Sequence, residues 1–349
     1  MRSLVHTFPN RVRSVLRSAP AWGLLMAAMP LVGLLPTTTP AAFAKGPAYT
    51  DPQAAGADFQ IQGEYRGEII GEDREETWGA QVIALGDGKF QLNGFKGGLP
   101  GDGWSRGDET QTYQGAIEDG SGNRAVFDAE RATLEIADGK LAVIVDGNTL
   151  ATLEKVERES PTLGKEPPAG ATVLFDGSSV DAWESAKLVD EKWLGATNAV
   201  TREKFGDHSL HVEFRTPFMP HDRGQARGNS GVYIQGRYEL QVLDSFGLEG
   251  KNNECGGIYT IAEPAVNMCF PPLAWQTYDI DFTAARYDGD QKTQNARVTI
   301  RHNGVLIHDD LELPSGTPGF RPEGPGDESL FLQDHGDPVV FRNIWVVTK

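Results

Sequence analysis

The sequence predicts a protein built almost entirely from β-strands. Its 349 residues include 41 glycines and 21 prolines, which divide the chain into short runs. Within those runs apolar and polar residues alternate, as they do in strands with one buried face. No stretch keeps the 3.6-residue period of an amphipathic helix over several turns. We therefore expect an all-β fold, and the length allows two domains of ordinary size.

The first 44 residues have the layout of a secretory signal peptide. An apolar run occupies residues 21–35, and small residues at 42 and 44 precede Lys45. The positive charges before the run are Arg2, Arg11, Arg13 and Arg17. Cleavage after Ala44 would make the mature protein periplasmic or secreted. An uncleaved anchor is the alternative, although the run is short and contains proline, so no stable membrane span is expected after cleavage.

The charge balance disfavours nucleic acid as a partner. The formal net charge is −17, and loss of the four leader arginines would change it to −21. A nucleic-acid binder needs a basic face to offset the phosphates, which this composition does not provide. A neutral ligand such as a carbohydrate suits the composition better.

Residues 58–157 are expected to form a small accessory β domain. Four segments of alternating residues are joined by Gly-Asp, Asp-Gly and Gly-Ser turns, which are typical of antiparallel hairpins. These segments are 59–69, 80–95, 113–129 and 132–145. Their polar residues are scattered, so no function follows from them. Residues 158–170 contain three prolines and two glycines, which predicts a linker.

Residues 171–349 are expected to form a two-sheet sandwich or jelly roll. Alternating runs recur without intervening helices, and within residues 296–310 Asn303-Gly304 separates two β segments, which is a strong hairpin signal. The main runs are 209–215, 277–282, 296–310 and 339–347. The last of these is apolar enough to be a central strand.

A set of motifs in this second region resembles the 3-keto-disaccharide hydrolase family. In order they are LFDG (174–177) with Trp183, NSGVYIQGRYELQVLDS (229–245), GGIY (256–259), PPLAWQTYDI (271–280), NG (303–304), LQDHG (332–336) and VVFRNIWV (339–346). The resemblance implies a concanavalin-like jelly-roll fold over residues 171–349. It also implies an extracytoplasmic enzyme that acts on glycosides whose sugar carries a ketone at carbon 3.

One strand, residues 236–245, carries the candidate catalytic residues. Side chains two positions apart share a face, so Arg237, Glu239 and Gln241 form one row. The opposite row is apolar and is expected to face the core; it is Tyr238, Leu240 and Val242. The polar row is either a solvated sheet face or the lining of a ligand groove.

The chemistry of a keto sugar favours the second interpretation. The ketone acidifies the hydrogen on carbon 2, so a single base can remove it and the group on carbon 1 can leave before water adds. Glu239 is the candidate base. Arg237, Gln241 and His335 are candidate hydrogen-bond donors, although His335 could instead cap its own turn.

Aromatic and amide side chains near this strand are candidate sugar contacts. Sugars are held by aromatic faces and amides because their rings have both C–H patches and hydroxyls. The candidates are Asn229, Ser230, Tyr233, Trp275 and Gln333. Core packing of Trp275 and turn formation by Asn229 and Ser230 are the alternatives.

Two other functions are compatible with the sequence. Glu239, Gln241 and Asp244 resemble the Glu-x-Asp-x-x-Glu signature of laminarinase-type glycosidases. However, Gln241 cannot ionise, and Asp244 shares the face of Glu239 only if a bulge intervenes. A conventional glycosidase would need a second carboxyl at a set separation. The other alternative is a non-catalytic carbohydrate-binding module on the same fold.

Cys255 and Cys269 are the only cysteines. In an oxidising compartment we expect them to form a disulfide that closes a loop of about 15 residues. Two buried thiols are the alternative. No cofactor is expected, and no compact metal motif occurs. The acidic loop 118–123 has too few defined ligands to predict a calcium site.

Overall fold

The computed structural model of the protein describes residues 45–70, 75–118 and 122–349. The expected signal peptide and its cleavage after Ala44 lie outside these residues. The all-β prediction is confirmed: within the described ranges the helices are one short α-helix, α1 (Gly56–Ile61), and two single 3₁₀ turns, η1 (Pro52–Ala54) and η2 (Gly224–Ala226). None of them is long and apolar enough to cross a membrane.

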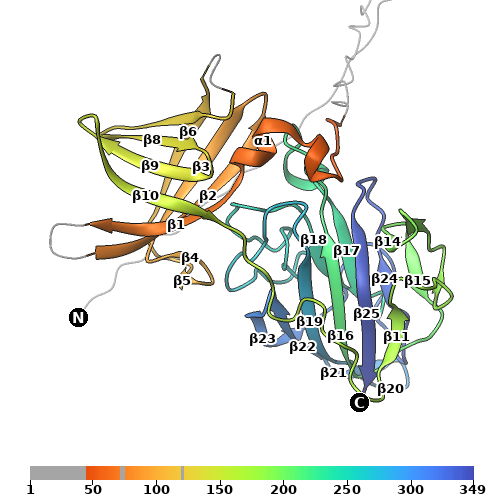
Figure 1. Ribbon diagram of the computed structural model, residues 1–349. Helices are drawn as coiled ribbons and strands as arrows, with labels where there is room; N and C mark the ends of the chain where they lie inside the picture. Colours follow the sequence, from red (N-terminus) through yellow and green to blue (C-terminus); the bar gives the residue numbers. More distant parts are fainter. Residues whose placement is uncertain (1–44, 71–74, 119–121) are drawn as a thin grey trace, which may run out of the picture. The chain divides into compact units, whose positions relative to one another are not determined.

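The first part of the chain forms a closed eight-stranded antiparallel barrel (Figure 1). Its strand order is β1-β10-β9-β8-β7-β6-β3-β2. The strands are β1 (Gly63–Ile70), β2 (Glu75–Gly86), β3 (Lys89–Lys96), β6 (Thr110–Ile117), β7 (Ala125–Ala129), β8 (Ala132–Ala137), β9 (Lys140–Val145) and β10 (Asn148–Val156). Two short strands, β4 (Leu99–Pro100) and β5 (Gly103–Trp104), pair beside it. Closure removes the free sheet edges that a meander of this length would otherwise expose.

Helix α1 packs on one end of the barrel. Ile61 of α1 is buried in the barrel core, and its carbonyl accepts a 2.6 Å hydrogen bond from the Tyr65 hydroxyl. Gln62, which follows the helix, accepts a hydrogen bond from the backbone N–H of Ala84 on β2. The turn between β2 and β3 needs positive φ at Asp87 and Gly88 (54° and 69°), a conformation that suits this Asp-Gly pair.

The second part of the chain forms two packed sheets, which confirms the expected β-sandwich. The larger sheet has the order β13-β14-β25-β16-β19-β22-β23, with β11 paired to β25. Its strands are β11 (Thr172–Phe175), β13 (Leu188–Val189), β14 (Trp193–Gly195), β16 (His208–Arg215), β19 (Gln276–Thr283), β22 (Ala296–His302), β23 (Val305–Leu313) and β25 (Val340–Thr348). The run expected to be a central strand is β25, which is hydrogen-bonded to β14, β11 and β16.

The smaller sheet carries the strand with the candidate residues. Its order is β12-β15-β24-β17-β18. The strands are β12 (Trp183–Glu184), β15 (Ala199–Thr201), β17 (Ser230–Ile234), β18 (Tyr238–Val242) and β24 (Phe331–Leu332). A separate hairpin is formed by β20 (Arg286–Asp288) and β21 (Gln291–Gln294).

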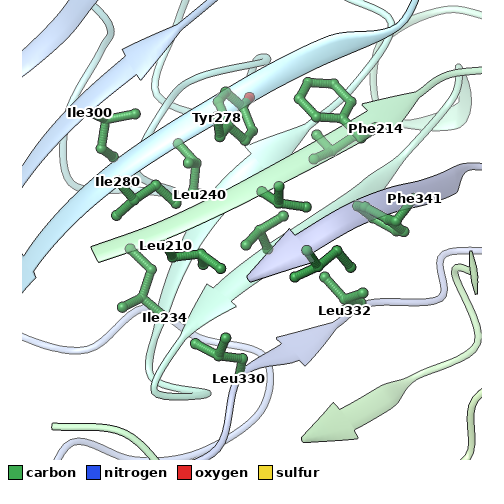
Figure 2. Packing of buried hydrophobic residues seen from close by; sticks show 14 of the residues in the cluster. Leu210, Phe214, Ile234, Leu240, Tyr278, Ile280, Ile300, Leu330, Leu332 and Phe341 are labelled. Carbon is green, nitrogen blue, oxygen red and sulfur yellow. The ribbon is translucent and has the colours of Figure 1, made fainter. Parts of the chain in front are cut away.

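The core lies between the two sheets. Figure 2 shows Leu210, Phe214, Tyr278 and Ile280 of the larger sheet packed with Leu240 of the smaller one. Each of these side chains is at most 3 % exposed. Leu240 therefore faces the core as expected, and its neighbours in β18 on either side, Glu239 and Gln241, point to the opposite face of the sheet.

The segment expected to be a linker is bound to the outer face of the larger sheet. The Thr162 hydroxyl donates a 2.6 Å hydrogen bond to Asp279, and the backbone N–H of Gly164 donates a 2.5 Å bond to Glu213. The Ser160 hydroxyl lies 2.6 Å from that of Thr277. We call residues 160–165 the strap. It covers a polar cluster that would otherwise face water.

The expected disulfide is not formed. Cys255 and Cys269 are free thiols in the sandwich core, 0 % and 1 % exposed. The Cys255 sulfur lies 3.2 Å from the Tyr278 hydroxyl, and the Cys269 thiol donates to the Leu243 carbonyl at 3.5 Å. Both cysteines act as small core residues with local hydrogen bonds, which is the alternative that the sequence left open.

Candidate active site

A cavity of about 250 Å³ lies on the face of the smaller sheet that points away from the core. Strands β17 and β18 form its floor, and loops from distant parts of the chain complete it. The lining residues are Gln225, Asn229, Tyr233, Glu239, Gln241, Tyr259, Pro318, Gly319, Gln333 and His335. Six of them were candidates from sequence alone.

The β17–β18 hairpin places the two central side chains together. Tyr233 and Glu239 are direct cross-strand partners, as are Gly231 and Gln241. The turn that joins the strands has positive φ at Gln235 and Gly236 (51° and 61°), which sets the register. Side chains that are direct partners lie close on the same face, so the Tyr233 phenol lies beside the Glu239 carboxyl.

Glu239 is a buried carboxyl with few partners. Its residue is 4 % exposed, and burial raises its pKa to about 7, while a hydrogen bond from the Tyr233 hydroxyl opposes part of that rise. Gly231 provides the space for the carboxyl: a Cβ there would lie 2.8 Å from Glu239 Oε1. Near neutral pH this group therefore exists in both protonation states, as a general base should.

Tyr233 remains a neutral phenol. Burial and the neighbouring Glu239 carboxylate both raise its pKa. Its hydroxyl accepts a 3.2 Å hydrogen bond from Gln333 Nε2 and lies 3.5 Å from the Pro318 carbonyl. Because hydrogen bonds to charged acceptors are stronger, its single proton goes to Glu239 when that carboxyl is ionised. Gly319, at φ 130°, lets the chain pass over the phenol where a Cβ would collide with the hydroxyl.

A network centred on Gln225 holds two amides in the cavity wall. Gln225 Oε1 accepts from Asn229 Nδ2 at 3.2 Å and from Gln241 Nε2 at 3.1 Å. Gln225 Nε2 in turn donates to the Asn253 carbonyl at 2.7 Å. This last bond fixes which end of the Gln225 amide is oxygen, and the other two amide orientations follow from it.

Three residues of the cavity lining have amide oxygens without partners within the described ranges. Asn229 Oδ1, Gln241 Oε1 and Gln333 Oε1 are buried and have no hydrogen-bond partner within the described part of the chain. All three belong to residues that line the cavity. Buried acceptors are costly unless they are satisfied. Together with the Glu239 carboxyl they make a lining that suits a ligand rich in hydroxyl donors, such as a sugar.

His335 lies at the exposed side of the cavity. The turn that carries it is held by Asp337, which is ion-paired to Lys45 at 2.6 Å and accepts the backbone N–H of Asn229 at 2.8 Å. These bonds tie the turn to the start of β17. His335 can therefore reach a bound ligand from the solvent side.

Four predicted residues lie outside the cavity lining. Arg237 is in the hairpin turn and donates to the Gly326 carbonyl at 3.0 Å. Asp244 follows β18 and is bound to Arg227 at 2.6 Å. The Ser230 hydroxyl donates to the Gln333 carbonyl at 2.7 Å, so it helps to position Gln333. Trp275 precedes β19 in the larger sheet and packs against Trp193.

Four lining residues were missed from sequence: Gln225, Tyr259, Pro318 and Gly319. Tyr259 is the last residue of the GGIY motif, and its place in that motif could have marked it as a candidate site residue. The others lie in irregular segments that have no periodicity to mark a face. Within the described ranges, no group of three His, Cys, Asp or Glu side chains is placed to hold a metal ion.

A comparison with known protein families shows to which family the sandwich belongs. Residues 170–347, half of the chain, match the family model of the 3-keto-alpha-glucoside-1,2-lyase-like domain. The chain belongs to this family. It is the 3-keto-disaccharide hydrolase family that the sequence motifs resembled, and membership supports a glycoside hydrolase-like function. A search of curated proteins finds no match.

Solved structures similar to the chain include three from Parabacteroides distasonis, each titled a "putative glycosyl hydrolase". One is 32 % identical to this chain with a TM-score of 0.48, and the match covers 52 % of this chain and 85 % of the chain in that structure. The second has 20 % identity and a TM-score of 0.38, covering 52 % and 94 %. The third has 21 % identity and a TM-score of 0.35, covering 51 % and 99 %.

Proposed function

We propose that the sandwich cleaves 3-keto-glycosides and that Glu239 is the base. The observation that carries this proposal is a carboxyl with a pKa of about 7, held in a cavity of otherwise uncharged acceptors. The description of the matched family names a 3-keto-alpha-glucoside and a 1,2-lyase reaction, which is the same chemistry. The titles of the similar structures name glycosyl hydrolases, which agrees with a glycoside as substrate.

The proposed reaction begins with proton removal. Glu239 takes the hydrogen from carbon 2, and the electron pair of that C–H bond forms an enolate with the ketone at carbon 3. When the enolate collapses, the ketone is restored, a carbon 1–carbon 2 double bond forms, and the bond from carbon 1 to the glycosidic oxygen breaks. The leaving oxygen takes up a proton, so the elimination is balanced. Addition of water across the double bond would complete a net hydrolysis.

The residues around Glu239 have matching roles. Once Glu239 has taken up the carbon-2 proton it no longer draws the Tyr233 hydrogen bond, so the neutral Tyr233 hydroxyl can donate to the oxygen on which negative charge has developed. The three unpartnered amide oxygens accept hydrogen bonds from sugar hydroxyls. Gln333 contributes to both functions, because its Nε2 holds Tyr233 while its Oε1 remains free.

The conventional glycosidase alternative has weaker support. That mechanism needs two carboxyl groups on either side of the scissile bond. Among residues 45–70, 75–118 and 122–349, Glu239 is the single carboxyl that lines the cavity, since Asp244 is bound to Arg227 elsewhere. A non-catalytic binding module would have no need of a buried ionisable group, and it is tested by the same experiment.

The test compares wild type with Glu239→Gln on a 3-keto-disaccharide and on its unoxidised parent, following the release of monosaccharide products. The amide keeps the shape and removes the base, so turnover should fall by roughly two to four orders of magnitude while much of the affinity remains. Glu312→Gln is the control, because Glu312 is an exposed carboxyl on β23 of the same sandwich.

Three results would contradict the proposal. Equal cleavage of the unoxidised sugar would identify a conventional glycosidase. Binding without cleavage of either sugar by the wild type would identify a binding module. Full activity of Glu239→Gln would remove Glu239 from the chemistry.

A further inference from the structure

The barrel contains a cavity of about 290 Å³ that has no role in the proposed reaction. It shares no lining residue with the Glu239 cavity. Eight-stranded closed barrels have an interior of a size that side chains fill completely or that holds one small ligand. This barrel is therefore of a size that its own side chains could fill, yet part of its interior is left open.

The two ends of the barrel differ in the size of their inward side chains. At the end covered by α1 the interior is filled by Tyr65, Phe90 and Phe127, each 0 % exposed. Towards the other end the lining includes Ala80, Gly94 and Ala132. A Cβ built on Gly94 would meet only ordinary contacts, the closest at 3.8 Å, and its φ does not require glycine. The small residue at this position therefore leaves space, and backbone geometry does not explain it.

The cavity wall is almost wholly apolar. Its floor includes Leu92 and Leu141, both 2 % exposed, and the half-buried rings of Trp78 and Tyr113 form part of its side. The Tyr113 hydroxyl donates a 2.7 Å hydrogen bond to Gln111 Oε1. These two residues are the polar pair of the wall.

Charges near the cavity do not favour an ionic ligand. Arg131, in the turn between β7 and β8, is the one charged residue among the described residues of the lining, and it is exposed. Two carboxylates, Glu130 and Glu109, lie close enough to raise the pKa of Tyr113, although burial is the larger cause. Among these named charges the two carboxylates outnumber the one guanidinium, so an anion gains no net attraction, and the apolar wall disfavours a cation because burying a charge without a partner is costly.

We propose that the barrel binds one uncharged, mainly apolar small molecule, with at most one polar group directed to Gln111 and Tyr113. The size and apolar lining resemble those of ligand pockets in general. The site is independent of the proposed reaction, because no residue of the Glu239 cavity takes part in it.

The experiment uses the full chain and the neutral fluorescent probe N-phenyl-1-naphthylamine, with the anionic 1-anilinonaphthalene-8-sulfonate as its size-matched comparison. Wild type should bind the neutral probe saturably with one site, and more tightly than the anionic one. Gly94→Leu should weaken that binding at least tenfold, because the leucine occupies the cavity. Thr133→Leu, which adds the same side chain on the exposed face of β8, should bind as wild type does.

Each result of this experiment either supports or overturns the proposal. Absence of saturable binding to wild type overturns the proposal, as does unchanged binding to a folded Gly94→Leu or tighter binding of the anionic probe. If circular dichroism shows that Gly94→Leu does not fold, Ala132→Leu repeats the test from the neighbouring wall. Glu239→Gln should bind the probe like wild type, so failure of the proposed reaction would leave this result intact.

Discussion

Two buried carboxyls in the same sandwich have opposite surroundings. Glu213 on β16 is 0 % exposed and Glu239 on β18 is 4 % exposed. Burial alone would raise both pKa values, yet that of Glu213 falls to about 2 while that of Glu239 rises to about 7. The difference lies in their partners. Glu213 accepts hydrogen bonds from Asn343, Arg342 and the backbone of Gly164 and lies 3.5 Å from His211 Nε2, whereas Glu239 has the Tyr233 hydroxyl.

This contrast distinguishes a carboxyl that stabilises the fold from the one that we propose as the catalytic base. The Glu213 cluster neutralises its charge and holds the strap on the larger sheet. Glu239 instead has the Tyr233 hydroxyl as a partner, and it lies in a cavity where three of the described lining residues have an unpartnered amide oxygen. Perturbed pKa values mark functional sites only when the direction and the partners are considered together.

The largest expected effect on stability comes from Glu213→Gln. Removing one member of a buried charge cluster leaves Arg342 and His211 without their shared partner, so we expect the free energy of unfolding to fall by roughly 3 kcal/mol. Urea denaturation measures this loss. At a temperature where the variant is folded, its kcat should stay within about twofold of wild type, because the cluster is outside the cavity. A stable Glu213→Gln, or one that is folded and inactive, would contradict the comparison.

The same contrast predicts opposite responses to pH. Glu213 is stabilising above its unfolded pKa of 4.5, and this contribution is lost as the pH falls from there to about 2. Glu239 has a raised folded pKa, so its ionisation costs stability as the pH rises from 4.5 to about 7. Glu239→Gln should therefore be more stable than wild type at pH 8 and equal to it at pH 4.

Activity should follow the ionisation of Glu239. If the base has a pKa of about 7, kcat/KM should rise about tenfold between pH 6 and pH 8, following the fraction of carboxylate. The measurement is the initial rate on a 3-keto-disaccharide at low substrate concentration. A flat profile over this range would mean that Glu239 does not carry the rate-limiting proton transfer.

The amide network is the next test. Gln225→Leu removes the acceptor that orients Asn229 and Gln241, so their amide groups can turn hydrogens towards the cavity. We expect KM to rise about tenfold with kcat within threefold, since hydroxyl binding is lost more than chemistry. Gln294→Leu, on the exposed strand β21, is the control. An unchanged KM would mean that the free amide oxygens do not hold the substrate.

The smallest effect is expected from Trp275→Ala. Trp275 lies between Trp193 and Arg342, with the guanidinium carbon 4.0 Å from its ring centroid, and does not line the cavity. Its loss should change kcat/KM by less than about twofold. A tenfold loss in a folded variant would show that this part of the larger sheet takes part in substrate binding.

The parts of the fold with period-two alternation were predictable. The runs at 209–215 and 339–347 correspond to β16 and β25. The prediction that Glu239 and Gln241 lie on the same face of their strand was also correct, because it follows from alternation alone. Arg237 left that row because positive φ at Gln235 and Gly236 ends the strand before it. The sequence has a glycine there but does not show how far the turn extends.

Other parts of the site had no local signal. Gln225 lies in a single 3₁₀ turn and Pro318 in an irregular loop, so neither belongs to a repeating pattern. The strap was predicted as a linker from its prolines and glycines, yet its hydroxyls and backbone are bound by Thr277, Asp279 and Glu213. Such contacts depend on the tertiary fold and cannot be read from composition.

The β17–β18 hairpin also determines the order in which the site can assemble. Tyr233 and Glu239 are joined by a short turn, so bringing them together costs little loop-closure entropy. Gln333 reaches Tyr233 across 100 residues of sequence and Pro318 across 85, and such distant contacts form slowly. During refolding, the base and its phenol should therefore meet well before the cavity closes around them. Recovery of catalysis will follow the arrival of these distant loops, so it measures the last stage of folding.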